Sequence, residues 1–371
     1  MTIPGGGGVP ANHASISNQG MALSHGLYIR PRALTILGTY RCTASCQNCC
    51  FASNPTIRLR LSLSDILAFI EEGSAYSSVK LVVFSGGECF LLGDDLNTAI
   101  EYATKKGLRT RCVTNGYWAK SLEHGRNRLR RLKDSGLKEL NISTGDYHQQ
   151  YVSVETVINA ACLGVELLEN TLIVVEMQRE RKVSAARIME DRRIRDLLTD
   201  PSAAKFRIIE SPWMPMNEEE RIDQNPERIL NRDNVYLRHG CRSIFTTVVL
   251  TPNKRLGFCC GLSRELIPEL NSTGPMMGLQ DLLLEAGSDF IKIWLFVDGP
   301  ERILQWAASK DANIDWEGRY AHHCHACLAL FQDSRVREVI RNHYSERVDD
   351  VLMRYSVLLR KQEILEEEVY G

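Results

Sequence analysis

The chain has 371 residues, and its 45 basic and 46 acidic side chains leave a formal net charge of -1. The chain therefore has no excess of positive charge with which to bind a nucleic acid or an anionic membrane surface. No apolar run approaches the ~20 residues of a bilayer-crossing helix, and residues 1–20 lack the basic region and apolar core of a signal peptide. We therefore expect one large domain plus a smaller one, with a small molecule or a polypeptide as partner.

Most of the twelve cysteines lie in clusters whose spacings are typical of metal ligands. A small secreted protein with many cysteines would be held by disulfides. This chain is long and shows no signal peptide, so we expect reduced thiols and a cytoplasmic location.

After a tail over residues 1–32, short apolar runs alternate with amphipathic stretches. Strands are predicted at 33–39, 80–87, 108–116, 137–145, 171–177 and 205–213, and helices at 62–73, 94–107, 121–136, 153–170 and 184–198. Such alternation implies parallel strands joined by right-handed crossovers. Six units are too few for the eight-stranded barrel. The prediction is an α/β fold, a partial (β/α)6 TIM-type barrel over residues 33–235.

The loop after the first predicted strand reads "TYRCTASCQNCCF", with Cys42, Cys46 and Cys49 at i, i+4 and i+7. Barrels place their chemistry in such loops. Three thiolates suit an iron–sulfur cluster with one iron left open, whereas a structural zinc site needs four closed ligands. Cys50 is a poor fourth ligand, because neighbouring residues rarely aim both side chains at one ion. The spacing favours the cluster and leaves zinc as the alternative.

Gly86, Gly87 and Glu88 stand at the end of the second predicted strand. Glycine removes the side chain where the backbone must approach a ligand closely. A lone Gly-Gly-Glu usually marks a turn, but here it follows a Cys-x3-Cys-x2-Cys loop by about forty residues. Together these motifs resemble the radical S-adenosylmethionine (radical SAM) enzymes, and the resemblance covers roughly residues 33–330.

The resemblance implies that the three cysteines hold a 4Fe-4S cluster whose open iron is chelated by the amine and carboxylate of S-adenosylmethionine. It places Gly86, Gly87 and Glu88 against the amine. It also implies that Asn115, Ser143 and Glu176, at later strand ends, face the cofactor or the substrate. For Asn115 with Gly116, a simple turn is about as good an interpretation.

One residue departs from the family's pattern. The residue before the third cysteine is usually aromatic and packs near the adenine, but here it is Asn48. Phe51 or Tyr40 is expected to supply that contact instead.

Asp146 and His148 follow the fourth predicted strand and are candidate catalytic residues. A histidine there suits proton transfer, because its pKa lies near neutrality. A histidine bonded to a loop carbonyl is the commoner alternative. Trp213 and Met214, after the sixth strand, are expected to line the substrate cavity or to serve as packing.

Residues 236–330 carry the remaining cysteine clusters. A predicted β-hairpin places Cys241 before its first arm and Cys259 with Cys260 at the end of its second, and Cys324 and Cys327 follow at Cys-x2-Cys. This resembles the short Twitch form of the SPASM-type domain, although Lys254 stands where the family has glycine. Cys241, Cys259, Cys324 and Cys327 are the implied ligands of a second, auxiliary Fe-S cluster, with Cys260 in reserve. A zinc ribbon that recruits His322, His323 or His325 is the alternative.

Residues 331–371 predict an amphipathic C-terminal helix that docks on the barrel or on a second copy. Its apolar face carries Val336, Val339, Ile340, Val348, Val351, Leu352, Tyr355, Leu358 and Leu359. The pattern does not choose between the two, and the oligomeric state stays open.

The resemblance implies an Fe-S oxidoreductase that cleaves S-adenosylmethionine to a 5'-deoxyadenosyl radical, which takes a hydrogen atom from an unactivated carbon. It also implies an electron donor such as flavodoxin or ferredoxin.

The expected substrate is a ribosomally made peptide, modified by crosslinking, thioether formation or epimerisation, although no extra N-terminal peptide-recognition domain is evident. Dehydrogenation of a small alcohol such as an aminoglycoside intermediate is the alternative, and a zinc-stabilised binding module a distant third. Epimerisation would need a thiol donor, for which Cys260, Cys89 and Cys112 are candidates.

Overall fold

The computed structural model describes residues 29–47, 49–199, 204–214, 216, 219, 224–259, 266–272, 274 and 277–370. An eight-stranded sheet in the order β6-β5-β4-β3-β2-β1-β7-β8 is its centre. The strands are β1 (Ala33–Leu37), β2 (Leu81–Ser85), β3 (Arg109–Thr114), β4 (Glu139–Gly145), β5 (Asn170–Met177), β6 (Phe206–Pro212), β7 (Thr247–Leu250) and β8 (Leu256–Gly257). Parallel pairing from β1 through β6 confirms the predicted α/β partial barrel.

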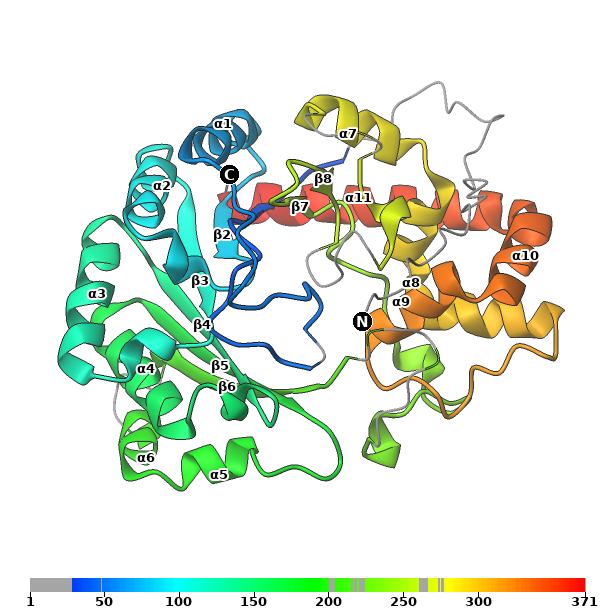
Figure 1. Ribbon diagram of the computed structural model, residues 1–371. Coiled ribbons are helices and arrows are strands. Elements are labelled where there is room, and N and C mark those ends of the chain that lie inside the picture. The colour runs from blue at the N-terminus through cyan, green and yellow to red at the C-terminus, as the bar shows by residue number, and fades with distance from the viewer. Residues whose placement is uncertain are drawn as a thin grey trace, which may run out of the picture.

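The first six helices cover the outer face of this sheet, on the left in Figure 1. They are α1 (Leu63–Ser74), α2 (Asp94–Lys105), α3 (Leu122–Asp134), α4 (Val154–Leu167), α5 (Ala185–Met189) and α6 (Arg192–Thr199). The helix α1 begins with a capping box, in which the side chains of Ser62 and Asp65 each accept the other's backbone N–H. Strand residues that face these helices, such as Leu34, Ile36 and Val82, are fully buried and form the core.

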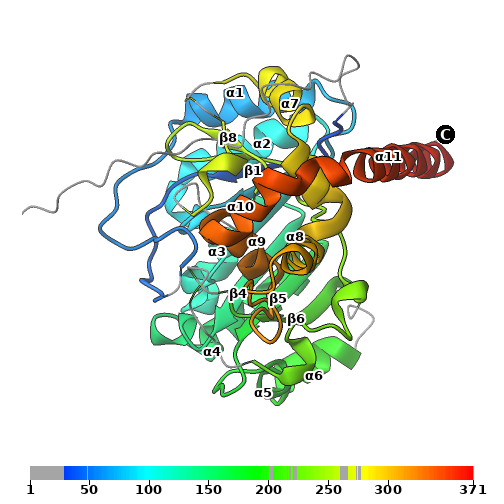
Figure 2. The ribbon, with the colours of Figure 1, turned by 90° about the vertical axis from the view of Figure 1, so that its right-hand side faces the viewer.

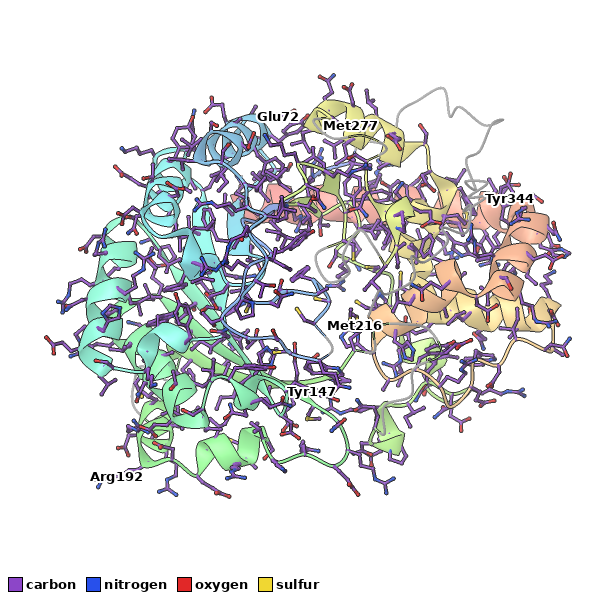
Figure 3. The ribbon with its side chains drawn as sticks, in the orientation of Figure 1. Glu72, Tyr147, Arg192, Met216, Met277 and Tyr344 are labelled. Atoms are coloured by element: carbon purple, nitrogen blue, oxygen red, sulfur yellow. The ribbon has the colours of Figure 1, made fainter. Side chains whose placement is uncertain are left out.

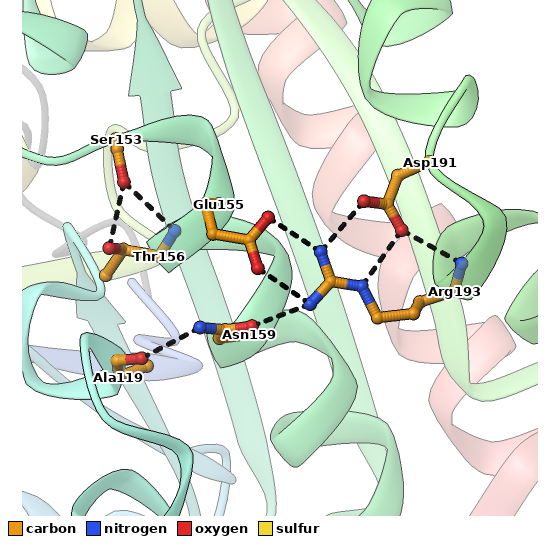
Figure 4. Close-up of polar contacts among 7 residues, drawn as sticks. All are labelled: Ala119, Ser153, Glu155, Thr156, Asn159, Asp191 and Arg193. Atoms are coloured by element: carbon orange, nitrogen blue, oxygen red, sulfur yellow. Dashed lines mark hydrogen bonds and ion pairs between the residues drawn. The ribbon is translucent and has the colours of Figure 1, made fainter.

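Arg193 of α6 links two helices on this outer face (Figure 4). Its guanidinium pairs with Glu155 of α4 and with Asp191, and it donates to Asn159 Oδ1 at 2.8 Å. Asn159 in turn donates to the carbonyl of Ala119 at 3.3 Å. Exposed ion pairs contribute little individually, so this network orients the short helix α6 rather than holding the fold together.

The hairpin of β7 and β8 is antiparallel, as predicted. It does not form a separate sheet, because β7 pairs in parallel with β1, from Ala33 opposite Thr247 to Ile36 opposite Leu250. The expected hairpin domain is therefore continuous with the barrel sheet, and the boundary placed before residue 236 stays a prediction.

Further helices form the C-terminal segment, and of these α8, α9 and α10 lie in front of the strands in Figure 2. They are α7 (Leu279–Gly287), α8 (Phe290–Lys310), α9 (His323–Gln332), α10 (Ser334–His343) and α11 (Val348–Tyr370). The first of them, α7, is tied to α1: the N–H of Leu279 donates to Glu72 Oε1 at 2.6 Å, and Figure 3 shows Glu72 beside Met277. In the described residues, no helix has both the length and the apolar character that crossing a membrane requires.

Two helices replace the single helix expected over residues 331–371, because a 3-10 turn over Tyr344–Arg347 separates α10 from α11. The first half of α11 packs within this chain: Arg354 pairs with Asp298 of α8 at 2.6 Å. The ring of Tyr355 lies 6.0 Å from that of Phe245 and 5.5 Å from that of Phe296. On the opposite side of α11, Met353 and Val357 are exposed.

Tyr355→Ala is expected to destabilise the folded protein by about 3 kcal/mol, because it removes a buried aromatic ring and leaves a cavity. Tyr355 is 1% exposed, and its hydroxyl has no partner among the described residues. Tyr355→Phe should therefore cost almost nothing. Met353→Ala, at a site 61% exposed on the same helix, is the control and should change little. Urea unfolding measures all three, and equal losses from Tyr355→Ala and Met353→Ala would contradict the packing of α11 on α8.

Candidate active site

The loop after β1 carries Cys42, Cys46 and Cys49 and folds back on itself. Its two arms are joined by backbone hydrogen bonds from Tyr40 to Leu59 at 3.2 Å and from Cys42 to Asn54 at 3.1 Å. From the β4 side, the hydroxyl of Tyr151 donates to the carbonyl of Ser45 at 2.7 Å. The cysteine loop is therefore held from both sides at the carboxyl end of the sheet, where the prediction placed it.

Gly86 and Gly87 press directly against the backbone of this loop. An added Cβ would lie 2.4 Å from the carbonyl oxygen of Thr39 at Gly86 and 2.3 Å from that of Arg41 at Gly87, and Gly86 has φ of +119°. The N–H of Gly87 donates to Thr39 O at 2.7 Å, and that of Glu88 to Arg41 O at 3.0 Å. The close approach that requires glycine here is thus an approach to the chain's own cysteine loop.

Glu88 turns its carboxylate under the loop rather than into the cavity. It is completely buried and accepts hydrogen bonds from Thr114 Oγ1 at 2.8 Å, from the N–H of Asn115 at 2.9 Å and from the N–H of Phe90 at 3.1 Å. Burial raises the pKa of Glu88 to about 7. Glu88 is not among the residues that line the cavity, and its carboxylate holds the end of β3. Its contact with the cofactor stays a prediction.

Asn115, whose backbone binds Glu88, also contacts the first cysteine through its side chain. Its side-chain Nδ2 donates to Thr43 Oγ1 at 3.0 Å and lies 3.6 Å from the sulfur of Cys42. Asn115 therefore supports the cysteine loop through its side chain. A residue that only formed a turn would not make these contacts.

A cavity of about 270 Å³ opens over these strand ends. It brings together the three predicted cysteines and most of the predicted cofactor and substrate residues. Its lining includes Cys42, Cys46, Cys49, Gly86, Gly87, Asn115, Ser143, His148, Glu176, Trp213 and Met214, together with Cys50 and Phe51. From the C-terminal segment, His322 and Cys324 line the same cavity. Figure 3 shows Tyr147 and Met216 in the space between the strands and the C-terminal helices.

Burial and mutual proximity discourage ionisation of the three thiols. Burial, first, and then neighbouring negative charge raise the pKa of Cys42 to about 11 and that of Cys46 to about 12. Cys49 adds to both shifts, which shows that the three sulfurs lie within electrostatic reach of one another. Thiolates so placed need a strongly cationic partner, and binding it must release protons.

The donor set fits an iron–sulfur cluster. In the parts of the chain that the structure describes, no three His, Cys, Asp or Glu side chains are grouped as ligands of a single metal ion. A cluster takes each thiolate on a different iron, so its ligands need not converge on one point. Three cysteine sulfurs that border one cavity, with glycine backbone beside them, meet that requirement.

His148 and Glu176 lie beside each other in the lining of the cavity, with His148 Nδ1 3.6 Å from Glu176 Oε2. Burial lowers the pKa of His148 to about 4 and raises the pKa of Glu176 to about 7. His148 is therefore neutral at neutral pH, and Glu176 is close to half protonated. The buried His148 Nδ1 and Trp213 Nε1 have no hydrogen-bond partner among the described residues. Buried polar atoms without partners in a cavity are suited to a ligand.

Asp146 does not line the cavity. Its carboxylate accepts the backbone N–H groups of Lys182 and Val183, at 3.0 and 2.9 Å, and so ties the segment after β5 to the end of β4. This geometry gives Asp146 a structural role and lends no support to the predicted catalytic one.

Of the two aromatic residues expected near the adenine, Phe51 lines the cavity and Tyr40 lies behind it. Their rings stack with centroids 6.4 Å apart. Asn48, which precedes the third cysteine, lies outside the described residues.

The expected ligands of the second cluster divide between two environments. Cys327 is buried, within electrostatic reach of Cys259 and Cys241, and burial raises its pKa well above the ordinary value. Cys324, one turn earlier on α9, lines the first cavity. Cys260 lies outside the described residues. Cys89 and Cys112 are completely buried away from the cavity, so neither reaches a substrate there.

His322 lines the first cavity, which the sequence does not predict. Its Nδ1 accepts the N–H of Cys324 at 3.0 Å, which caps α9 at the rim. In the sequence, His322 can be recognised only as a possible helix cap two residues before a cysteine. Its place in the cavity depends on the tertiary fold, which brings α9 to the strand ends.

Comparisons with known proteins agree with this geometry. Residues 36–162 match the model of the Radical SAM superfamily. YydG of Bacillus subtilis (strain 168), named as a peptide biosynthesis protein, is 28% identical over 119 residues, which are 32% of this chain and 37% of YydG. GTP 3',8-cyclase of Aliarcobacter butzleri (strain RM4018) is 32% identical over 142 residues, 36% of this chain and 41% of the cyclase. The chain thus spans about two fifths of the length of these relatives.

Among solved structures, that of anSMEcpe with bound AdoMet and Cp18Cys peptide has a TM-score of 0.50 at 12% identity, and the match covers 84% of this chain and 99% of that one. This likeness concerns the fold. The matched family segment contains the three cysteines and the Gly-Gly-Glu motif. Residues 36–162 thus carry the match to the Radical SAM superfamily, which binds a 4Fe-4S cluster and S-adenosylmethionine.

Gly87→Ala is expected to destabilise the apoprotein by about 1–3 kcal/mol, because the new methyl group overpacks against the backbone of Arg41. Gly278→Ala is the matched control, since its Cβ would meet only ordinary contacts beyond 3.4 Å. Chemical unfolding measures the stability, and iron content after anaerobic reconstitution reports on the loop. A Gly87→Ala protein as stable and as iron-rich as wild type would show that the loop does not depend on this contact.

Glu88 should make stability pH-dependent. Its pKa is raised from 4.5 to about 7, so between these values the folded protein holds a proton that the unfolded chain has released. Raising the pH through this window therefore costs the folded state up to about 3 kcal/mol. Glu88→Gln stays neutral, so its deficit relative to wild type should shrink from pH 4.5 to pH 7. A deficit that is constant over this range would mean that Glu88 is ionised throughout.

Proposed function

We propose that the chain is a radical SAM oxidoreductase that removes a hydrogen atom from an unactivated carbon of its substrate. The cavity carries this proposal, because it gathers the three cysteines, the glycine backbone of β2 and the polar ends of β3, β4 and β5 around one space. When bound, the reduced cluster and S-adenosylmethionine supply a 5'-deoxyadenosyl radical that abstracts the hydrogen. The protein's part is to bind, orient and exclude water.

Cys42, Cys46 and Cys49 would hold the cluster as thiolates, and Asn115 would keep its amide beside the sulfur of Cys42. Gly86 and Gly87 line the cavity beside the cysteines, and their backbone would meet the cofactor's amine there. Phe51 is placed to meet the adenine.

Glu176 and His148 are suited to hydrogen-bond a hydroxyl or amide of a bound ligand. A neutral imidazole both donates and accepts, and a carboxyl near its pKa does the same. Their neutrality is an advantage in a buried cavity, because an isolated charge there would be costly. A direct proton transfer by His148 remains part of the proposal, whereas Asp146 is better explained as a loop anchor.

A second cluster held by Cys241, Cys259, Cys324 and Cys327 is part of the proposal. The electrostatic proximity of Cys241, Cys259 and Cys327 supports it. Cys324, on the cavity side, would bring this cluster close to the substrate. It would accept the second electron when a substrate radical is oxidised, and an external donor such as flavodoxin or ferredoxin would supply the first cluster.

For the substrate we favour a ribosomally made peptide. The support is the partial match to YydG, which is named as a peptide biosynthesis protein. Dehydrogenation of a small alcohol is the second candidate. Among the peptide reactions, epimerisation needs a thiol donor, and burial removes Cys89 and Cys112 from that role, leaving Cys260. The described cysteines form no disulfide, and the proposed location is the cytoplasm.

Anaerobically reconstituted protein given dithionite and S-adenosylmethionine should release 5'-deoxyadenosine, and the Cys42→Ala, Cys46→Ala, Cys49→Ala variant should not. Cys162→Ala, on α4 outside the cavity, is the control and should keep full activity. Chromatography with mass detection measures the product. Iron should fall from about eight to about four per chain in the triple variant if the second cluster is present.

Wild-type protein that carries iron yet yields no 5'-deoxyadenosine, even with candidate peptides, would contradict the proposed activity. Zinc in place of the remaining iron in the triple variant would contradict only the second cluster.

A further inference from the structure

A second cavity, of about 560 Å³, lies at the start of α3 and is called the outer pocket below. The short turns that follow β2 and β3 and the first turns of α3 supply its lining, which is Phe90, Tyr117, Trp118, Lys120, Ser121, His124 and Arg128. In Figure 1, α3 lies to the left of the sheet, whereas α9, which lines the first cavity, lies to the right. The outer pocket is therefore reached from a side that a substrate in the first cavity does not occupy.

The outer pocket and the first cavity are lined by consecutive parts of one short segment. Thr114 and Asn115 line the first cavity. Tyr117 and Trp118, which follow after a single glycine, line the outer pocket. The N–H of Tyr117 donates to Asn115 Oδ1 at 3.0 Å, and Nδ2 of the same amide lies 3.6 Å from the sulfur of Cys42. One side chain, that of Asn115, thus connects the outer pocket to a cysteine of the proposed first cluster.

Basic side chains line the outer pocket without carboxylate partners. Lys120, His124 and Arg128 are spaced four residues apart, and the first two are exposed. Arg128 donates to neutral acceptors, Asn97 Oδ1 at 2.7 Å and the carbonyl of Gly93 at 3.0 Å. Within the part of the chain that the structure describes, none of the three basic residues forms an ion pair. Their positive charge is therefore left for a partner from outside.

Other cations of α3 are neutralised within the chain. Arg126 pairs with Glu166 and Arg131 pairs with Asp94, both at 2.6 Å. Glu123, in the first turn of α3, is exposed, but Lys120 and Arg128 together outweigh its charge. The uncompensated positive charge on this helix thus gathers at the outer pocket.

Aromatic rings form the buried part of the outer pocket. The rings of Phe90 and Trp118 stack, with centroids 4.8 Å apart and planes inclined by 4°. The guanidinium carbon of Arg128 lies 5.7 Å from the centroid of Phe90, which is a cation–π contact. Aromatic residues and arginine are enriched where proteins bind one another. The outer pocket therefore has the composition of a protein interface, with charge at its rim.

We propose that the outer pocket is the docking surface for a small acidic electron-transfer protein of the flavodoxin class, which reduces the first cluster. The inference rests on the proposed function, because it requires that cluster. One electron passes in each encounter: the donor's flavin is oxidised from hydroquinone to semiquinone, the cluster is reduced, and no bond forms or breaks. Asn115 supplies the contact between the pocket and the sulfur of Cys42. Opposite charges on the two proteins steer their encounter.

The first test measures the Kd of purified flavodoxin for the reconstituted full-length protein by isothermal titration calorimetry. Lys120→Glu should raise the Kd about tenfold, because it places like charges across the interface, and adding His124→Glu should raise it further. The wild-type Kd should also rise with salt concentration. Arg192→Glu, on α6 where the side chain is 87% exposed, is the charge-matched control and should leave the Kd unchanged.

The second test measures release of 5'-deoxyadenosine with two reductants. Flavodoxin, kept reduced by its reductase and NADPH and used below its Kd, should drive the Lys120→Glu protein about tenfold more slowly than wild type, following the loss of affinity. Dithionite should drive both proteins equally, because a small reductant needs no docking surface.

Equal Kd values for wild type and for the double variant would overturn the proposal, and so would a wild-type protein that does not bind flavodoxin. An equal loss of affinity in Arg192→Glu would also overturn it, because overall charge would then decide binding. A loss with dithionite as large as the loss with flavodoxin would assign Lys120 to the fold instead. Wild-type protein that releases no 5'-deoxyadenosine with dithionite would be a failure of the proposed function.

Discussion

The carbonyl oxygens of Thr39 and Arg41 occupy the space where side chains of residues 86 and 87 would begin. The two strand ends that build the site, those of β1 and β2, can meet only because both residues are glycine. Two backbone hydrogen bonds then fix the cysteine loop to the end of β2. The buried carboxylate of Glu88 extends this contact to β3, and Asn115 carries it on to the sulfur of Cys42. The position of the first cysteine thus depends on a backbone contact made before any cofactor is considered.

The other half of the site comes from the C-terminal segment. His322 and Cys324, at the start of α9, complete a cavity whose remaining walls are strand ends. The same helix carries Cys327, which lies near Cys241 and Cys259 in the interior. One turn of α9 therefore separates a residue that faces the substrate space from a residue of the proposed second cluster. This closeness is what a direct transfer of an electron from substrate to cluster would need.

The fold was predictable because parallel strands and their crossover helices leave a local pattern in the sequence. Apolar runs such as 81–85 and 171–177 and helices capped by serine define the six units without knowledge of their neighbours. The place of β7 was not predictable, because its pairing with β1 joins residues more than two hundred positions apart. The sequence pattern predicts one helix where the structure has α10 and α11, because their apolar residues continue one helical face across the 3-10 turn.

The site was predictable to the extent that its motifs are contiguous. Cys42, Cys46, Cys49, Gly86 and Gly87 lie at the cavity as the sequence indicated. The direction in which a side chain points was not predictable: Glu88 turns inward because donors of Thr114, Asn115 and Phe90 surround it. Asp146 meets two backbone N–H groups that belong to a distant loop.

In the proposed enzyme, three cysteines leave one iron of the first cluster open for S-adenosylmethionine. The most direct measurement is the EPR spectrum of the reduced first cluster, in protein whose Cys241, Cys259, Cys324 and Cys327 are replaced by alanine, recorded with and without S-adenosylmethionine. If S-adenosylmethionine binds the open iron, its addition should change the g values of the EPR signal. A reduced cluster signal that is identical with and without saturating S-adenosylmethionine would contradict it.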